Sequence, residues 1–159
     1  MTEGTKSLLF GSHQFIMHPL MVTLAWRRLY GRWPKPWQLV CIFLHDIGHF
    51  GKDYLTYFEH KKNHWKLGAN IAGKLFGDHA YWFTRWHSKT SNGGCWQGSK
   101  LFWADKYSWL IAPKWWLRTN NVVEGFSKRQ HDEWFKRAKE NWDNGCPKGS
   151  HELYLETRF

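Results

Sequence analysis

Residues 41–53, CIFLHDIGHFGKD, combine an apolar run with a cluster of ionisable side chains. Cys41 to Leu44 are apolar, and His45, Asp46 and His49 follow within the next five positions. Burying a carboxylate beside imidazoles costs several kcal/mol unless its charge is neutralised. A bound metal ion is one way to neutralise it, so this stretch predicts a hydrophobic helix that carries metal ligands into the core.

The composition favours one folded domain over residues 1–159. The chain is 42% hydrophobic and 19% aromatic, with 13 Trp, which excludes a disordered or low-complexity protein. The formal net charge is +10. Such a charge suits an anionic partner, namely a phosphorylated small molecule, nucleic acid or an acidic membrane surface, although it also serves solubility alone.

Cysteine content and hydropathy predict a cytoplasmic protein with no membrane partner. The three cysteines form no CxxC motif and leave one unpaired in any disulfide scheme, which is typical of a reducing compartment. The N-terminus lacks the pattern of a secretory signal. No apolar run approaches the roughly 18 residues that a membrane span needs.

Hydrophobic spacing predicts a compact all-α bundle with no strand. Gly77 is expected to cap one helix and Asp78 to be the N-cap of the next, and Ser127 with Gln130 forms a capping-box pattern. The core is expected over about 14–112, the C-terminal helix over about 128–142 and a loose tail over 144–159. The predicted helices span 18–30, 36–50, 64–76, 79–87, 99–112 and about 128–142.

Six potential metal ligands fall on five of these helices. His49 should share a face with His45, four residues earlier. A mixed imidazole and carboxylate set suits Mn, Fe, Co, Ni or Zn rather than Ca. The other histidines are expected to be ordinary hydrogen-bonded residues: His13, His60, His79, His131 and His151. The six candidate ligands are His18, His45, Asp46, His64, His87 and Asp105.

The order of these residues resembles the HD-domain metal-dependent phosphohydrolase superfamily over about residues 14–112. FLHDIGH matches its signature, His18 matches the histidine of its first helix, and FWADKYSW matches its late helix with the final Asp. The resemblance implies that one metal is held by His18, His45, Asp46 and Asp105. HWKLGA and WHSKTSNG look like elements of the binuclear branches, which assigns His64 and His87 to a second metal with Asp46 bridging.

The residues within the motifs indicate one part of the superfamily. The cyclic-dinucleotide branch reads HDIGK, whereas His49 replaces that Lys here. HDIGH is similar to the motif of deoxynucleoside-triphosphate hydrolases, in which the second His faces substrate phosphates. Those enzymes are much longer, and compact HD nucleotidases, including small phage-encoded ones, match the length better.

The resemblance therefore implies a nucleotide phosphohydrolase that uses one or two divalent transition metals. A hydroxide formed at the metal would attack a phosphate ester or anhydride of a nucleotide such as a dNMP or dNTP. His49 is expected to donate a proton to a phosphate oxygen or the leaving group, beside Asp46. Lys52, Lys106 and Lys89 are candidate phosphate clamps, each with the alternative of a solvated surface Lys, and Trp65 is a candidate base contact.

Several alternatives stay open at this point. An HD-type cyclic or dinucleotide phosphodiesterase uses the same ligands, and so does a diiron HD oxygenase that activates O₂. A non-catalytic HD module is disfavoured because every core ligand position is filled. The basic and aromatic C-terminal segments leave nucleic-acid binding open without favouring it, and the resemblance implies a homo-oligomer.

Overall fold

The computed structural model describes residues 1–53, 58–88, 91, 98–125 and 127–145, and the regular elements in these ranges are helical without exception. The all-α class is therefore confirmed. In chain order the elements are α1 Glu3–Phe10, α2 Met17–Tyr30, α3 Pro36–Leu44, the 3₁₀ turn η1 Ile47–His49, α4 Phe58–Lys62, α5 Trp65–Phe76, α6 Asp78–Arg85, α7 Lys100–Ile111, α8 Lys114–Val123 and α9 Lys128–Gly145.

Local sequence explains several helix ends. Pro36 begins α3, where its missing N–H and fixed φ are tolerated. Gly31 ends α2 with φ 67°, a left-handed conformation that favours glycine. The backbone N–H of Ser127 donates to Gln130 Oε1 at 2.8 Å and the N–H of Gln130 donates to Ser127 Oγ at 3.3 Å, which confirms the capping box before α9.

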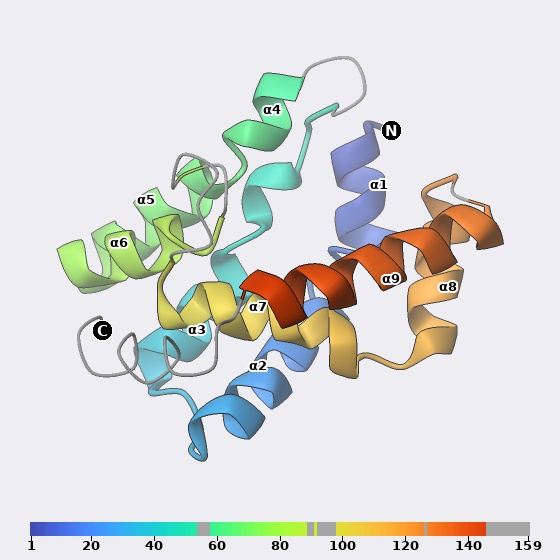
Figure 1. Cartoon of the computed structure of the whole chain (residues 1–159). Coiled ribbons are helices and arrows are strands. Elements are labelled where there is room, and N and C mark those ends of the chain that lie inside the picture. The colour runs from blue at the N-terminus through green and yellow to red at the C-terminus, as the bar shows by residue number, and fades with distance from the viewer. Residues whose placement is uncertain (54–57, 89–90, 92–97, 126, 146–159) are drawn as a thin grey trace.

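The main core lies between α2, α3, α5, α6 and α7. Helices α5 and α6 form an antiparallel pair on one side, α7 runs along α2, and α9 crosses in front of α7 (Figure 1). A smaller cluster around Trp116 and Leu117 joins α8 to the start of α2. The fully buried apolar residues of the main core are Val22, Ala25, Trp26, Cys41, Ile42, Ala72, Ala80, Phe83, Leu101 and Ala104.

The helix predicted over 36–50 ends six residues early, at Leu44. Asp46 has φ −100° and ψ 2°, outside the helical region, and η1 then turns the chain. Gly48 explains the turn, since a Cβ there would lie 1.7 Å from the carbonyl oxygen of His64. Gly68 of α5 is constrained in the same way, since a Cβ there would lie 2.2 Å from the carbonyl oxygen of Leu44. Backbone packing against α5 therefore ends α3 at the motif.

Other boundaries differ in smaller ways from the predictions. Gly77, with φ 88°, caps both α5 and α6, so Asp78 is the first residue of α6 rather than its N-cap. The short helices α1, α4 and α8 were not predicted. Helix α9 runs to Gly145, beyond the expected start of the tail, and residues 146–159 lie outside the described part of the chain.

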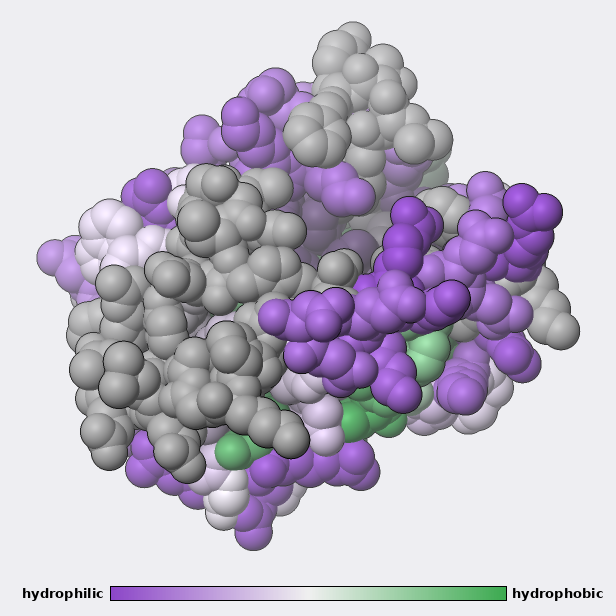
Figure 2. Space-filling view, viewed as in Figure 1, coloured by the Kyte–Doolittle hydropathy of each residue, from purple (hydrophilic) through white to green (hydrophobic). Residues whose placement is uncertain are grey.

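The surface of α9 is hydrophilic along its exposed side (Figure 2). In the described ranges, none of the helices combines the length and the apolar composition required to cross a membrane.

Candidate metal centre

The structure brings the six predicted ligands together from five helices and the turns beside them. His18 lies in the first turn of α2 and Asp105 in the middle of α7. His45 and Asp46 follow α3, His64 lies between α4 and α5, and His87 follows α6. Five of the six side chains are buried, and His64 is partly buried.

Two imidazole nitrogens lie beside one carboxylate oxygen of Asp46, and Asp105 adds a second carboxylate next to them. The Nε2 atom of His18 lies 3.3 Å from Asp46 Oδ2 and 3.1 Å from Asp105 Oδ1. His45 Nε2 lies 3.1 Å from the same Asp46 oxygen and 3.3 Å from His18 Nε2. We call His18, His45, Asp105 and Asp46 Oδ2 the carboxylate-rich end of the centre.

The other carboxylate oxygen of Asp46 faces a second set of imidazoles. His64 Nε2 and His87 Nε2 lie 3.7 and 3.5 Å from Asp46 Oδ1, and 3.1 Å from each other. We call His64, His87 and Asp46 Oδ1 the imidazole end. Asp46 thus stands between two groups of donors, in the position that a bridging ligand requires.

Three of the histidines are oriented by the helices that precede them. The Nδ1–H groups of His45, His64 and His87 donate to the carbonyl oxygens three residues earlier, at 2.5, 2.6 and 2.6 Å respectively. Each of these carbonyls lies in the last turn of a helix, and those of Lys61 and Thr84 also accept the backbone N–H three residues later. Because Nδ1 is engaged, Nε2 is the ring nitrogen that faces Asp46 and that would bind a metal.

The protonation states at the carboxylate-rich end are set by its two carboxylates. Burial lowers the pKa of His18, but hydrogen bonds and charge from Asp105 and Asp46 raise it to about 9. Burial raises the pKa of both carboxyl groups. The opposing charge of His45 nevertheless holds the pKa of Asp46 well below its usual range, and the charges of Lys106 and His18 do the same for Asp105. Both carboxylates are therefore ionised at neutral pH.

At the imidazole end the rings are neutral. Burial lowers the pKa of His64 and His87, and the neighbouring histidines lower it further. Neutral imidazoles and ionised carboxylates are the forms that bind divalent transition metals.

These residues fit a metal ion by both chemistry and spacing. Two ligand atoms that each lie about 2.1 Å from one ion are about 3.0–3.4 Å apart at octahedral to tetrahedral angles. The nitrogen pairs at 3.3 and 3.1 Å match that separation, although the facing lone pairs of neutral His64 and His87 are otherwise repulsive. The cluster therefore has the donors to hold a divalent transition metal.

The predicted substrate residues occupy different surroundings. His49 lies within the cluster, with Nε2 3.5 Å from Asp46 Oδ1 and its ring stacked on that of His64. His49 lies beside the same carboxylate as His45 because the turn η1 brings it there. The helical i, i+4 spacing that was expected does not apply. Lys106 Nζ contacts Asp105 Oδ2. Lys52 is exposed.

Trp65 and Lys89 complete the predicted substrate set. The indole of Trp65 is buried, and the guanidinium of Arg85 lies 4.8 Å from its ring centre. Lys89 lies outside the described residues. Their roles stay predictions.

His13, which was expected to be an ordinary core residue, borders the cluster. Its ring centroid lies 4.5 Å from that of His49, and its Nδ1 lies 2.8 Å from Ser7 Oγ. One potential ligand atom each from His13, Asp46 and His49 lie within 4.8 Å of one another. No motif spacing marks His13, because the contact depends on how α1 and the turn after it pack against η1.

The basic helices α8 and α9 carry several ion pairs of their own. Arg118 pairs with Asp132, Arg129 with Glu133 and Lys136 with Glu140. These acids offset part of the positive charge on which the suggestion of nucleic-acid binding rested.

Comparison with protein families gives one match. The model of the HD domain matches residues 15–121, which include all six predicted ligands. Comparisons with curated proteins and with solved structures gave no match.

Proposed function

The chain belongs to the HD-domain metal-dependent phosphohydrolase superfamily, and on this premise we propose that it hydrolyses a phosphate ester or anhydride of a nucleotide. The observation that carries the proposal is the convergence of four histidine nitrogens on the two oxygens of Asp46, with Asp105 beside His18. We propose that His18, His45, Asp46 and Asp105 hold one divalent transition metal, and that His64 and His87 hold a second with Asp46 between them.

When bound, a divalent metal would lower the pKa of a coordinated water to about 7 and would polarise phosphoryl oxygens. The chain's own contribution is to hold the donors rigidly. The backbone carbonyls fix the rings of His45, His64 and His87, and burial excludes water that would compete for the carboxylates.

Lys106 is the candidate partner of a substrate phosphate. Its side chain is 30% exposed, and its ammonium group contacts the 5% exposed side chain of Asp105, so Lys106 connects the buried carboxylate with solvent. When the charge of Asp105 is shared with a metal, the ammonium can turn to an incoming phosphate oxygen. The +10 net charge of the chain favours the approach of the same anions.

The test is a substrate panel with purified protein. Deoxynucleoside mono- and triphosphates, cyclic nucleotides and dinucleoside polyphosphates are incubated with Mn²⁺, Co²⁺ or Fe²⁺, and both released phosphate and nucleotide products are measured. We expect metal-dependent turnover of at least one class, abolished in Asp46→Asn.

The panel also separates the alternatives. Nucleotide products without free phosphate from cyclic or dinucleotide substrates would identify a phosphodiesterase. No hydrolysis, together with iron-dependent consumption of O₂, would replace the proposal with the oxygenase function.

A further inference from the structure

The segment before α2 and the end of α8 together build an addition to the centre. Glu124, which follows α8, accepts hydrogen bonds from Ser7 Oγ at 2.5 Å, from the backbone N–H of Ser12 at 2.7 Å and from Ser12 Oγ at 2.6 Å. Ser7 in turn lies 2.8 Å from Nδ1 of His13. Ser7, Ser12, His13 and Glu124 lie outside residues 15–121, so this arrangement is additional to the part of the chain that matches the HD domain.

The chain of hydrogen bonds determines which nitrogen of His13 carries the lone pair. A carboxylate only accepts hydrogen bonds, so the hydroxyl proton of Ser7 is committed to Glu124. Ser7 Oγ must then accept from His13, which places the proton of the neutral ring on Nδ1. The Nε2 atom is left as an acceptor.

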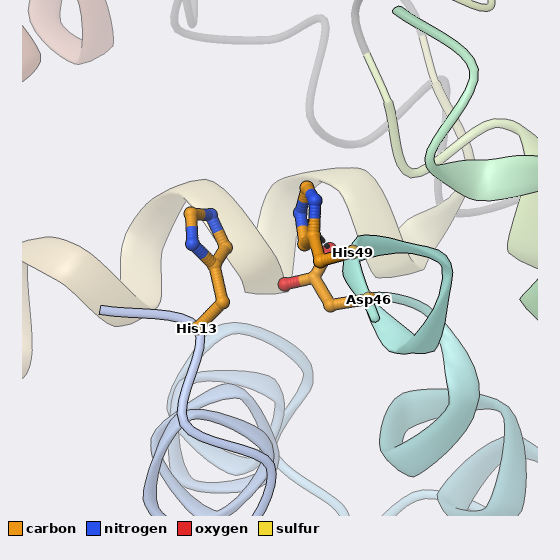
Figure 3. Close-up of side chains that lie close together, drawn as sticks. All are labelled: His13, Asp46 and His49. Atoms are coloured by element: carbon orange, nitrogen blue, oxygen red, sulfur yellow. Dashed lines mark ion pairs between the residues drawn. The ribbon is translucent and has the colours of Figure 1, made fainter. Parts of the chain in front are cut away.

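The ring of His13 borders the cluster, and one of its nitrogens lies within 4.8 Å of ligand atoms of Asp46 and His49. Figure 3 shows the rings of His13 and His49 on either side of a carboxylate oxygen of Asp46. Two imidazoles and one carboxylate form a common ligand set for divalent iron and related metals, and they leave coordination positions open. A carboxylate behind a ligating histidine, here through the Ser7 hydroxyl, is the usual means of orienting such a ligand.

We propose that His13, His49 and Asp46 form a further cation position that takes a divalent transition metal. The proposal rests on the proposed metal centre, because it shares Asp46 with it. It assigns His49 to a cation in place of the predicted role as a donor to the substrate. With one carboxylate shared between positions, this cation binds more weakly than the one beside Asp105 and fills last.

The experiment measures bound Mn²⁺ per chain at increasing free Mn²⁺, by equilibrium dialysis and elemental analysis, without substrate. The variants are His13→Ala and Glu124→Gln, with His79→Ala as the control, since His79 is an exposed histidine that contacts Trp37 instead of the cluster. Wild type and His79→Ala are expected to bind one more Mn²⁺ than His13→Ala at saturation. Glu124→Gln is expected to weaken that last ion about 10-fold while it leaves the stoichiometry unchanged.

Equal stoichiometry and affinity in wild type and His13→Ala would overturn the proposal and leave His13 as a residue that only packs. Should His13→Ala fail to fold, as judged by circular dichroism, His13→Gln takes its place with the same expected loss. If wild type binds no Mn²⁺, the proposed function fails as well. If His13→Ala binds as many Mn²⁺ ions as the wild type, only the further position is refuted and the proposed function stands.

Discussion

The carboxylate-rich end and the imidazole end of the centre are built from different parts of the fold. His18 and Asp105 project from within α2 and α7, two long helices that pack directly on each other. His64 and His87 instead follow the short helices α4 and α6, and their rings are held by carbonyls at the helix ends. The first end supplies Asp105 and one oxygen of Asp46, whereas the second shares only the other oxygen of Asp46.

This difference has a consequence for metal binding. Each ionised carboxylate adds a full charge to the attraction for a divalent ion, while a neutral imidazole adds a lone pair only. The carboxylate-rich end should therefore fill first and bind most tightly. The imidazole end should fill at higher metal concentration, and it depends on the packing of turns more than of long helices.

Removal of the shared ligand gives the largest expected effect. Asp46→Asn keeps the shape of the side chain but takes a charged ligand from both ends. We expect bound metal to fall below one ion per chain and hydrolysis to fall by about 100-fold or more, since ligand loss should exceed the 10–100-fold effect of outer residues. Elemental analysis and the phosphate-release assay measure both quantities.

Asp53→Asn is the matched control for that variant. The carboxylate of Asp53 accepts a hydrogen bond from the backbone N–H of Glu3 at 2.8 Å and takes no part in the cluster. Full metal content in Asp46→Asn, equal to that of Asp53→Asn, would contradict the bridging position of Asp46.

Separate variants at the two ends give the next effect. His87→Ala should lose the weaker ion and retain the tight one, because the donors of the carboxylate-rich end are untouched. His18→Ala should lose the tight ion. A titration of each variant with Mn²⁺ followed by electron paramagnetic resonance distinguishes the two results, and identical losses in both variants would show that the ends do not bind independently.

A smaller effect is expected from substitution of Gly48, which packs against the backbone of His64 at the imidazole end. Gly48→Ala places a Cβ 1.7 Å from the carbonyl oxygen of His64, so η1 and α5 must move apart. We expect a loss of about 1–3 kcal/mol in the free energy of unfolding and weaker binding of the second ion. Urea denaturation measures the first and the Mn²⁺ titration the second.

Gly51→Ala is the control for Gly48→Ala, because it adds a Cβ without a clash. An added Cβ at Gly51 meets no neighbouring atom, but its φ of 73° makes alanine unfavourable. Equal metal binding in Gly48→Ala and the wild type would show that the close approach of η1 to His64 does not control the imidazole end.

Much of the fold and the centre could be predicted because the signals are local. Apolar spacing and capping residues such as Ser127 indicate most of the long helices, and the six candidate ligands follow from short motifs placed on them. The end of α3 at Leu44 could not be predicted, since it depends on the contact between Gly48 and the backbone of His64. The place of His13 depends on Glu124, 111 positions later in the chain, and nothing in the local sequence encodes that contact.

The most direct test of the metal centre is anomalous diffraction from crystals grown with Mn²⁺, recorded near the manganese absorption edge. The account predicts a strong anomalous peak between His18, His45, Asp46 and Asp105 and a weaker one between Asp46, His64 and His87. A map with no peak within bonding distance of Asp46, from protein that is folded and saturated with Mn²⁺, would contradict it.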